Sequence, residues 1–255
     1  MKQRHFGQPD TDAQTAGADL ALLHALIGHY ARQLWDVQRA RLALSHRAAA
    51  LKRDGVPEQW HLPMLVAATD LAATEHAIGL ELTRLARQHF LSGWIQEAPG
   101  IGLGGFARLL GVTGPLERFA TVSKLWAYMG LHVVDGAAPR SRRGRPARWS
   151  AQGRVICHQI GVAIVRLGAG RYRVAYDRKK AEYLARPRRG PSACPFEQVH
   201  RTTKGAVVLC GLKHADNAAR RYAVKALLRD MWEAWHALAP SSGEAAVIGL
   251  ECANT

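Results

Sequence analysis

The chain has 255 residues, of which 48% are apolar, 35 are Lys or Arg and 20 are Asp or Glu, so its formal net charge is +15. This apolar fraction allows a sizeable core and excludes a wholly disordered or collagen-like chain. No run of about 18 apolar residues is present, and the polar amino terminus lacks the features of a secretory signal. Four Cys are too few and too scattered for a disulfide framework. We therefore expect a cytoplasmic protein with reduced thiols and no membrane partner.

The positive charge is concentrated in one part of the chain. Residues 1–98 hold 10 basic and 10 acidic residues, whereas residues 99–238 hold 25 basic and 8 acidic residues, a net charge of +17. Repulsion among so many positive charges does not stabilise a fold. The excess charge therefore indicates a polyanionic partner, and improved solubility is the alternative explanation. We expect double-stranded DNA and a nucleoid-associated location. A structured RNA is the alternative ligand, because charge alone does not separate the two.

Residues 19–91 are predicted to form a helical hairpin or coiled-coil arm, preceded by a disordered stretch over residues 1–18. Two segments repeat apolar residues at spacings of three and four, and Asp54, Gly55 and Pro57 separate them. A packed pair within one monomer and a dimerisation arm, giving a homodimer or higher oligomer, both fit this pattern. The first stripe is Leu23, Ile27, Tyr30, Leu34, Val37, Leu44, Ala48 and Leu51, interrupted by Arg41; the second is Met64, Ala68, Leu71, Ile78, Leu82 and Leu85, interrupted by Glu75.

Residues 92–238 are predicted to form a second, compact helical domain, so that the fold class is mainly α. Between Leu131 and Trp149, two Val residues and the turn dipeptide Asp135-Gly136 favour a short β-hairpin. A long irregular stretch is expected before the last helix, and a flexible tail after it. The helices are expected at about 121–129, 151–167, 171–185 and 214–238, the irregular stretch at 187–213 and the tail at 239–255.

The segment from Ser92 to Gly111 predicts two helices joined by a tight turn. Ser92 is the expected cap of the first helix, which must end before Pro99, and the second is expected to start near Leu103. Glycines leave backbone N–H groups uncovered at the start of the second helix, which favours a phosphate there. A Gly-rich turn with a purely structural role is the alternative. The pattern resembles the helix-hairpin-helix DNA-binding motif, with Gly100, Ile101, Gly102, Gly104 and Arg108 as candidate DNA-binding residues and Ile101 also filling the core.

A second candidate DNA-binding segment lies between Pro139 and Trp149, and we call it the arginine segment. Its Gly and Pro prevent a helix, and an extended run of arginines can follow a phosphate backbone or enter a minor groove. Trp149 is expected to anchor in the core, with base stacking as the alternative, and Ser150 to cap the next helix. The candidate arginines are Arg140, Arg142, Arg143, Arg145 and Arg148.

No catalytic residue, metal site or cofactor is assigned from the sequence. Four residues carry side chains that can bind zinc, but their separations match no common zinc spacing, so loop and core roles are expected. A metal-ion nuclease needs clustered carboxylates, and residues 99–238 have few. The four residues are Cys194, His200, Cys210 and His214.

A series of motifs follows in order along residues 98–235: Ala98-Pro-Gly-Ile-Gly102, Ala107 to Gly111, Pro115-Leu-Glu-Arg-Phe119, Leu125-Trp-Ala-Tyr-Met-Gly-Leu131, the arginine segment, Trp149-Ser150, and Arg220 to Trp235. Together they resemble the carboxy-terminal domain of the insertion-sequence 110/116/902 transposases, and the resemblance covers about residues 99–238. Members of that family join a RuvC-like domain with a carboxylate tetrad, through a helical linker, to this domain. They act as DNA recombinases, and some are guided by a structured RNA.

Two departures from the family pattern bear on catalysis. The first 90 residues are expected to be helical, without the strand-borne carboxylates of a RuvC-like domain. The family's catalytic Ser follows the motif matched by Gly130-Leu131, where this chain has Asp135-Gly-Ala-Ala138. Ser141 lies a few residues further on, and the pattern does not assign it that role. Whether the protein is an enzyme therefore stays open.

The sequence favours a transposase-family DNA-binding protein, involved in transposition or recombination and catalytically incomplete. Strand cleavage through Ser141 is an alternative from the enzyme class. A structured-RNA-binding module and a stand-alone helix-hairpin-helix regulator are alternatives from the binding class. A base-excision glycosylase is disfavoured, because such enzymes place an Asp about 20 residues beyond the hairpin, where this chain has Ala120-Thr-Val122.

Overall fold

Every regular element is a helix in the part of the chain that the structure describes, a computed structural model covering residues 11–133, 139, 144, 146–185 and 210–239. Its side chains are described from residue 19 onward and, in the last helix, from residue 213. The mainly α prediction is confirmed. The elements are α1 (Thr11–Arg53), α2 (Glu58–Arg87), α3 (Ser92–Glu97), α4 (Leu103–Thr113), the 3-10 helix η1 (Leu116–Arg118), α5 (Val122–Tyr128), α6 (Ala151–Leu167), α7 (Arg171–Ala185) and α8 (Cys210–Leu238).

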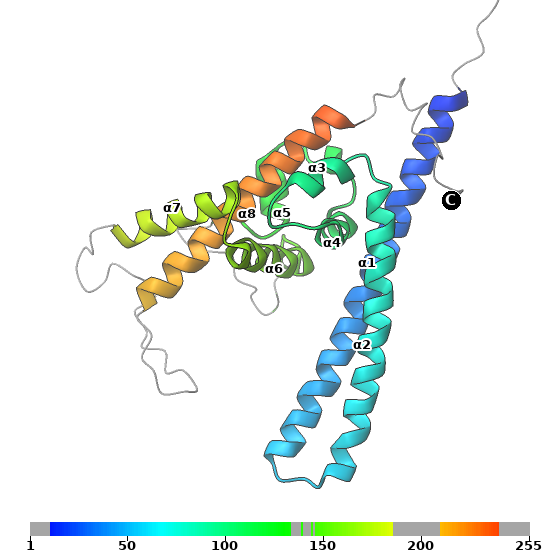
Figure 1. Ribbon diagram of the computed structural model, residues 1–255, viewed down its shortest axis with the longest axis vertical. Helices are drawn as coiled ribbons and strands as arrows, with labels where there is room; N and C mark the ends of the chain where they lie inside the picture. Colours follow the sequence, from blue (N-terminus) through cyan, green and yellow to red (C-terminus); the bar gives the residue numbers. More distant parts are fainter. Residues whose placement is uncertain (1–10, 134–138, 140–143, 145, 186–209, 240–255) are drawn as a thin grey trace, which may run out of the picture.

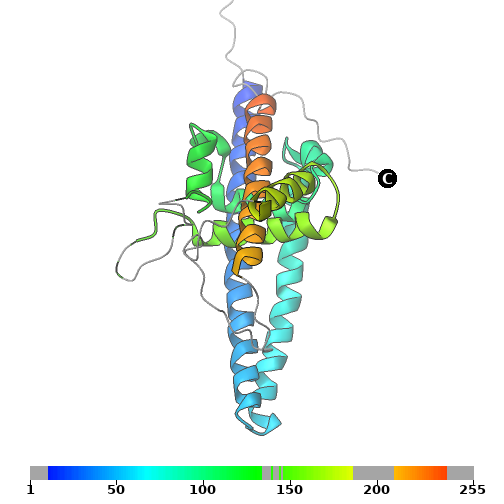
Figure 2. The same cartoon turned by 90° about the vertical axis from the view of Figure 1, so that its left-hand side faces the viewer.

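Helices α1 and α2 form the predicted antiparallel pair, and we call it the arm. Its turn lies where Gly55 adopts a φ of 75° and the N–H of Val56 donates to the carbonyl of Leu51, a common way to end a helix. Figures 1 and 2 both show the turn end of the arm projecting beyond the other helices. The residues of both predicted stripes are buried or half-buried, so the periodicity identified the packed faces correctly.

The two residues that interrupt the apolar stripes are paired with each other across the arm. Arg41 Nε donates to Glu75 Oε2 at 2.6 Å, and Gln38 Nε2 donates to Glu75 Oε1 at 2.7 Å. Burial works to raise the pKa of the Glu75 carboxyl, but the bonds from Arg41 and Gln38 outweigh it and hold the pKa below its ordinary value. The breaks in the pattern are therefore a polar contact that fixes the register of α1 on α2.

Helix α4 lies against the arm and connects it to the rest of the molecule (Figure 1). Its glycines allow a very close approach: a Cβ atom at Gly111 would lie 2.2 Å from the Cβ of Ala31 and 3.2 Å from the carbonyl oxygen of Ile27. Beside this contact, Phe106, Leu109 and Leu110 of α4 are buried in one core. That core extends from the first half of α1 and the second half of α2 to α8, without a break between arm and body.

Helix α8 closes the body and packs along α7, α6 and α5. Met231 and Trp235 are buried on its inner face, whereas Tyr222 and Leu238 are exposed. On α7, the hydroxyls of Tyr172 and Tyr176 each donate to an Asp of α8. These bonds keep two buried phenols satisfied where α7 crosses α8.

A pair of histidines, His89 buried and His24 half-buried, joins the start of α1 to the segment between α2 and α3. His89 is 1% exposed, and its Nδ1 accepts the N–H of Leu91, which leaves Nε2 to donate to His24 Nε2 at 3.1 Å. The His89 ring also lies 5.2 Å from Trp235 and 5.1 Å from Phe106, measured between centroids. Burial, and secondarily the neighbouring His24, lowers the pKa of His89 to about 3.

Four details of the predicted organisation differ from the structure. Helix α1 begins at Thr11, so residues 11–18, which were expected to be disordered, are helical. The described residues between Leu131 and Trp149 include no strand, so the β-hairpin is not found there; Asp135-Gly136 lies outside the described residues. Helix α8 begins at Cys210 and therefore includes residues expected to be irregular. The 3-10 helix η1 was not predicted, because a three-residue element carries no periodic signal. Among the described residues, no helix combines the length and apolar character needed to cross a bilayer.

Adding a methyl group at Gly111 should weaken the contact between α4 and the arm. We expect Gly111→Ala to lower the free energy of unfolding by about 1–3 kcal/mol, the usual cost of overpacking. Gly79→Ala is the matched control, because a Cβ there meets nothing within 4 Å, and it should stabilise by about 0.5–1 kcal/mol. Chemical denaturation measures both. Adding Ala31→Gly to Gly111→Ala should recover part of the loss, and additive effects in the double variant would contradict the contact.

The histidine pair should make the fold sensitive to acid. An unfolded His takes up a proton near pH 6.5, whereas His89 in the fold stays neutral down to about pH 3. Stability is therefore complete above the unfolded pKa and falls, on the order of 1 kcal/mol per pH unit, as the pH drops through this window. His89→Leu should flatten the dependence of unfolding free energy on pH between 4 and 6.5, whereas the exposed His46→Gln should not. An equal slope in His89→Leu and the unsubstituted protein would contradict this assignment.

Candidate nucleic-acid interface

The turn between α3 and α4 follows the predicted path. Helix α3 ends before Pro99, and α4 begins at Leu103. Gly100 adopts a φ of 90°, and a Cβ there would lie 2.5 Å from Ile164 Cγ1, so the turn is pressed onto α6. Ile101 is buried and fills the core beneath the turn, as predicted. The turn is therefore rigidly held from two sides.

The predicted cap of α3 is wrong. Leu91 occupies the N-cap position without a side-chain bond, and Ser92 is the first residue inside the helix. The N–H of Leu91 is instead bound to His89 Nδ1. A Ser before an apolar segment indicates a helix start only to within a residue or two.

The amino terminus of α4 is open to solvent. Gly102 occupies its N-cap position with an extended backbone (φ −98°, ψ 172°), is exposed, and makes no side-chain cap bond. A Cβ at Gly102 would meet nothing within 4 Å. The first N–H groups of α4 therefore have no acceptor from the N-cap side chain, and the partial positive charge of the helix end faces outward.

An open groove of about 800 Å³ runs from this turn along α6. Gly100, Ile101 and Gly102 form one side, and α6 forms the other. The α6 side includes the exposed side chains of His158, Gln159 and Arg166, which carry hydrogen-bond donors. The open helix end thus lies beside a row of polar side chains on a second helix.

Two candidate residues of α4 face the arm instead of this groove. The Cβ position of Gly104 lies 3.2 Å from Thr83 Oγ1 of α2. Arg108 donates from Nη2 to Gln38 Oε1 at 3.2 Å, and burial lowers its pKa despite the nearby carboxylate of Glu75. Both residues hold α4 on the arm, so they contribute to the position of the turn.

The ends of the arginine segment meet at one side chain of α6. Arg154 Nη1 donates to the carbonyl of Pro139 at 2.6 Å, and its guanidinium lies 4.9 Å from the ring centroid of Trp149. Trp149 is half-buried against Gly130, and Ser150 caps α6 by accepting the N–H of Gly153, as predicted. Of the candidate arginines, Arg148 is exposed, and Arg140, Arg142, Arg143 and Arg145 lie outside the described residues.

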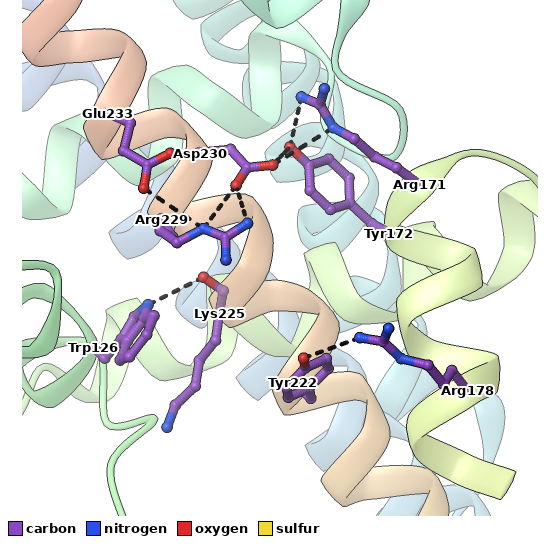
Figure 3. A network of polar contacts seen from close by, with 9 residues as sticks. All are labelled: Trp126, Arg171, Tyr172, Arg178, Tyr222, Lys225, Arg229, Asp230 and Glu233. Atoms are coloured by element: carbon purple, nitrogen blue, oxygen red, sulfur yellow. Dashed lines mark hydrogen bonds and ion pairs between the residues drawn. The ribbon is translucent and has the colours of Figure 1, made fainter. Parts of the chain in front are cut away.

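Sequence reasoning missed three cations beside this segment: Arg154 of α6, and Arg221 and Lys225 of α8. All three are half-buried, and Lys225 Nζ lies 5.0 Å from the ring centroid of Trp126, whose indole N–H donates to the Lys225 carbonyl (Figure 3). Burial lowers the pKa of Arg221 and of Lys225. The positive charge of Arg154 lowers the pKa of Arg221 further, and that of Arg221 lowers the pKa of Lys225. The available signal was the spacing of four between Arg221 and Lys225, with the apolar Ala223 and Val224 between them.

The carboxylates of α8 already have partners. Asp230 accepts the Tyr172 hydroxyl at 3.1 Å and pairs with Arg171 and Arg229 (Figure 3). Asp216 accepts the Tyr176 hydroxyl and also pairs with Lys180 and Arg220. These groups neutralise part of the basic surface and are tied to the packing of α7 on α8.

Residues 93–176 match the family model of the transposase IS116/IS110/IS902 family. The chain carries a transposase domain of this family. The match begins in α3, includes the turn, the arginine segment and α6, and ends within α7. None of the curated proteins and none of the solved structures that were compared with the chain gives a significant match.

The described part of the transposase domain contains no group of three or more His, Cys, Asp or Glu side chains placed to hold a metal ion. His214 lies edge-on to the Tyr183 ring, and burial lowers its pKa. Ser141, Cys194, His200 and the side chain of Cys210 lie outside the described residues. Cys157 is a buried free thiol whose pKa burial raises to about 12, which makes it unreactive.

Proposed function

We propose that the transposase domain binds double-stranded DNA and takes part in transposition or recombination, with the α3–α4 turn acting as a helix-hairpin-helix contact to the phosphate backbone. The observation that carries the proposal is the open amino terminus of α4 at Gly102, beside the groove along α6 that His158, Gln159 and Arg166 help to line. Unpaired N–H groups and the helix dipole favour a phosphate at such a site without reading the base sequence. The family match independently supports a DNA partner.

In this proposal the candidate residues have different roles. Gly102 offers backbone N–H groups to the phosphate, while Gly100 and Ile101 give the turn its shape and anchor it. Gly104 and Arg108 hold α4 on the arm and act on the DNA through the position of the turn. The arginines at 140, 142, 143, 145 and 148 supply further phosphate contacts and a large counterion-release term.

We further propose that residues 19–91 act as an arm and residues 92–238 as the DNA-binding unit, with a second copy of the chain binding to the arm. The far end of α2 exposes large apolar side chains, which a monomer rarely keeps together on one helix. Trp60 is 65% exposed, Leu62 45% and Val66 54%. We assign no catalytic residue, so the proposed function is binding by a catalytically incomplete member of the family.

Gly102→Asp should separate DNA binding from folding. The carboxylate would accept the free N–H groups of α4 and thus stabilise the protein by about 1 kcal/mol, while repelling a phosphate. We expect thermal stability to rise and affinity for a duplex oligonucleotide to fall about tenfold or more at 0.1 M salt, measured by fluorescence anisotropy across a salt series.

Two controls accompany this variant. Gly102→Ala adds no charge and should leave affinity nearly unchanged, and Gly93→Asp adds the same charge at an exposed position of α3 where a Cβ meets nothing within 4 Å. An equal loss of affinity in Gly93→Asp and Gly102→Asp would mean that only the net charge matters, and would show that the α3–α4 turn is not the phosphate contact. Tighter binding of a structured RNA than of the duplex in competition would favour the alternative ligand.

The arm proposal is tested by the mass of the protein in solution. We expect Leu62→Glu with Val66→Glu, two exposed positions one helical turn apart, to convert a dimer into a monomer in sedimentation velocity without loss of helix by circular dichroism. Leu22→Glu, which is 58% exposed on α1, is the matched control and should remain dimeric. A monomeric unsubstituted protein at micromolar concentration would overturn the proposal.

A further inference from the structure

Arg154, Arg221 and Lys225 form a set of like charges, which we call the cation set, where α6 packs on α8. The two helices approach closely there, since a Cβ at Gly161 would lie 3.3 Å from Val224 Cγ2 and 3.4 Å from Arg220 Cβ. Arg154 acts electrostatically on Arg221, and Arg221 on Lys225. Two helices thus bring three positive groups within range of one another.

None of the ion pairs among the described residues involves a member of the cation set. The contrast with the neighbouring residues of α8 is direct, because Arg220 pairs with Asp216 at 2.8 Å and Arg229 with Asp230 at 2.7 Å. Tyr183 lies near Arg221 and works to raise the pKa of its guanidinium, but burial outweighs this and the pKa is lowered. Among the residues that the structure describes, the charge of the cation set therefore has no paired carboxylate, whereas the neighbouring Arg220 and Arg229 do.

Partial burial makes this arrangement unfavourable for the protein alone. Desolvating a cation and placing like charges together both oppose the charged form, which agrees with the lowered pKa of Arg221 and of Lys225. Gln at these positions would avoid the cost while keeping most of the packing. An anion bound between the cations would remove the same cost, and a phosphodiester accepts hydrogen bonds from guanidinium and ammonium groups well.

The position of the cation set relates it to the arginine segment. Arg154 binds the carbonyl of Pro139 and lies over the ring of Trp149, so the two ends of the arginine segment both contact this member of the cation set. Trp126 holds the Lys225 main chain through its indole N–H, and its ring centroid lies 5.0 Å from Lys225 Nζ (Figure 3). Arg154 and Lys225 are therefore held in place before any ligand arrives, which lowers the entropic cost of binding.

We infer that Arg154, Arg221 and Lys225 form a built phosphate-binding site for the nucleic-acid backbone, adjoining the arginine segment and separate from the α3–α4 turn. This inference deepens the proposed function and rests on it for the identity of the ligand. The site takes a phosphodiester group by charge and hydrogen bonding, without contact to base edges. It fixes where the backbone lies on α8, next to Pro139 and Trp149 at the two ends of the arginine segment.

Arg221→Gln with Lys225→Gln tests the site through two opposite effects. Affinity for duplex DNA should fall about tenfold at 0.1 M salt, and the plot of log K against log salt should become less steep by about one to two units. In the same variant the melting temperature without DNA should rise, because repulsion is relieved. A purely structural cation set would instead give a lower melting temperature and an unchanged salt slope.

The control variant is Lys52→Gln with Arg53→Gln, at two exposed positions near the end of the arm. It has the same change in net charge and should keep the DNA affinity and salt slope of the unsubstituted protein. Inorganic pyrophosphate, compared with chloride at equal ionic strength, gives a readout that does not depend on DNA. It should raise the melting temperature of the unsubstituted protein and not that of the Arg221→Gln, Lys225→Gln variant. If DNA binding is not detected at all, the proposed function fails; equal pyrophosphate shifts in both proteins overturn the site itself.

Discussion

The close approach of α4 to the arm is the constraint on which the position of the proposed interface depends. Gly111 allows α4 to contact Ala31 directly, and on the same helix Arg108 reaches Gln38 of α1. The turn at the other end of α4 is pressed onto α6 through Gly100. Because α4 is fixed at both ends, the open helix end at Gly102 cannot shift relative to α6. A phosphate contact made by backbone N–H groups needs this rigidity, since no flexible side chain corrects a misplaced helix.

Most of the helical organisation could be predicted from the sequence, because long amphipathic helices carry a strong periodic signal. The pairing of Arg41 with Glu75 could not. Each residue was visible as a break in its own stripe, but periodicity along one helix does not determine the register between two helices. The β-hairpin prediction rested on local propensity in a short segment, where tertiary context overrides propensity most easily. The division into an arm and a DNA-binding unit is still a proposal, because the core runs through both.

Less of the candidate site could be predicted, because sequence patterns show local backbone restrictions but not contacts between helices. The turn residues were found because glycines and Pro99 restrict the backbone locally. Arg108 is the opposite case, since spacing alone does not tell whether an arginine one turn into a helix faces solvent or a neighbouring helix. Its bond to Gln38 decides this. Arg154, Arg221 and Lys225 were counted in the net charge but not singled out, because their proximity arises only when α6 packs on α8.

Which basic residues have a paired carboxylate says more about the basic surface than its total charge does. Arg220 and Arg229 of α8 are matched by Asp216 and Asp230, which also accept the buried tyrosine hydroxyls of α7. The carboxylates of this helix therefore serve the fold, and no ion pair among the described residues involves Arg221 or Lys225, which lie between them. A sequence under pressure for stability alone would remove such an imbalance with a single Gln or Glu. This imbalance lies beside the arginine segment, as expected for a surface whose counter-charge is supplied by a nucleic-acid backbone.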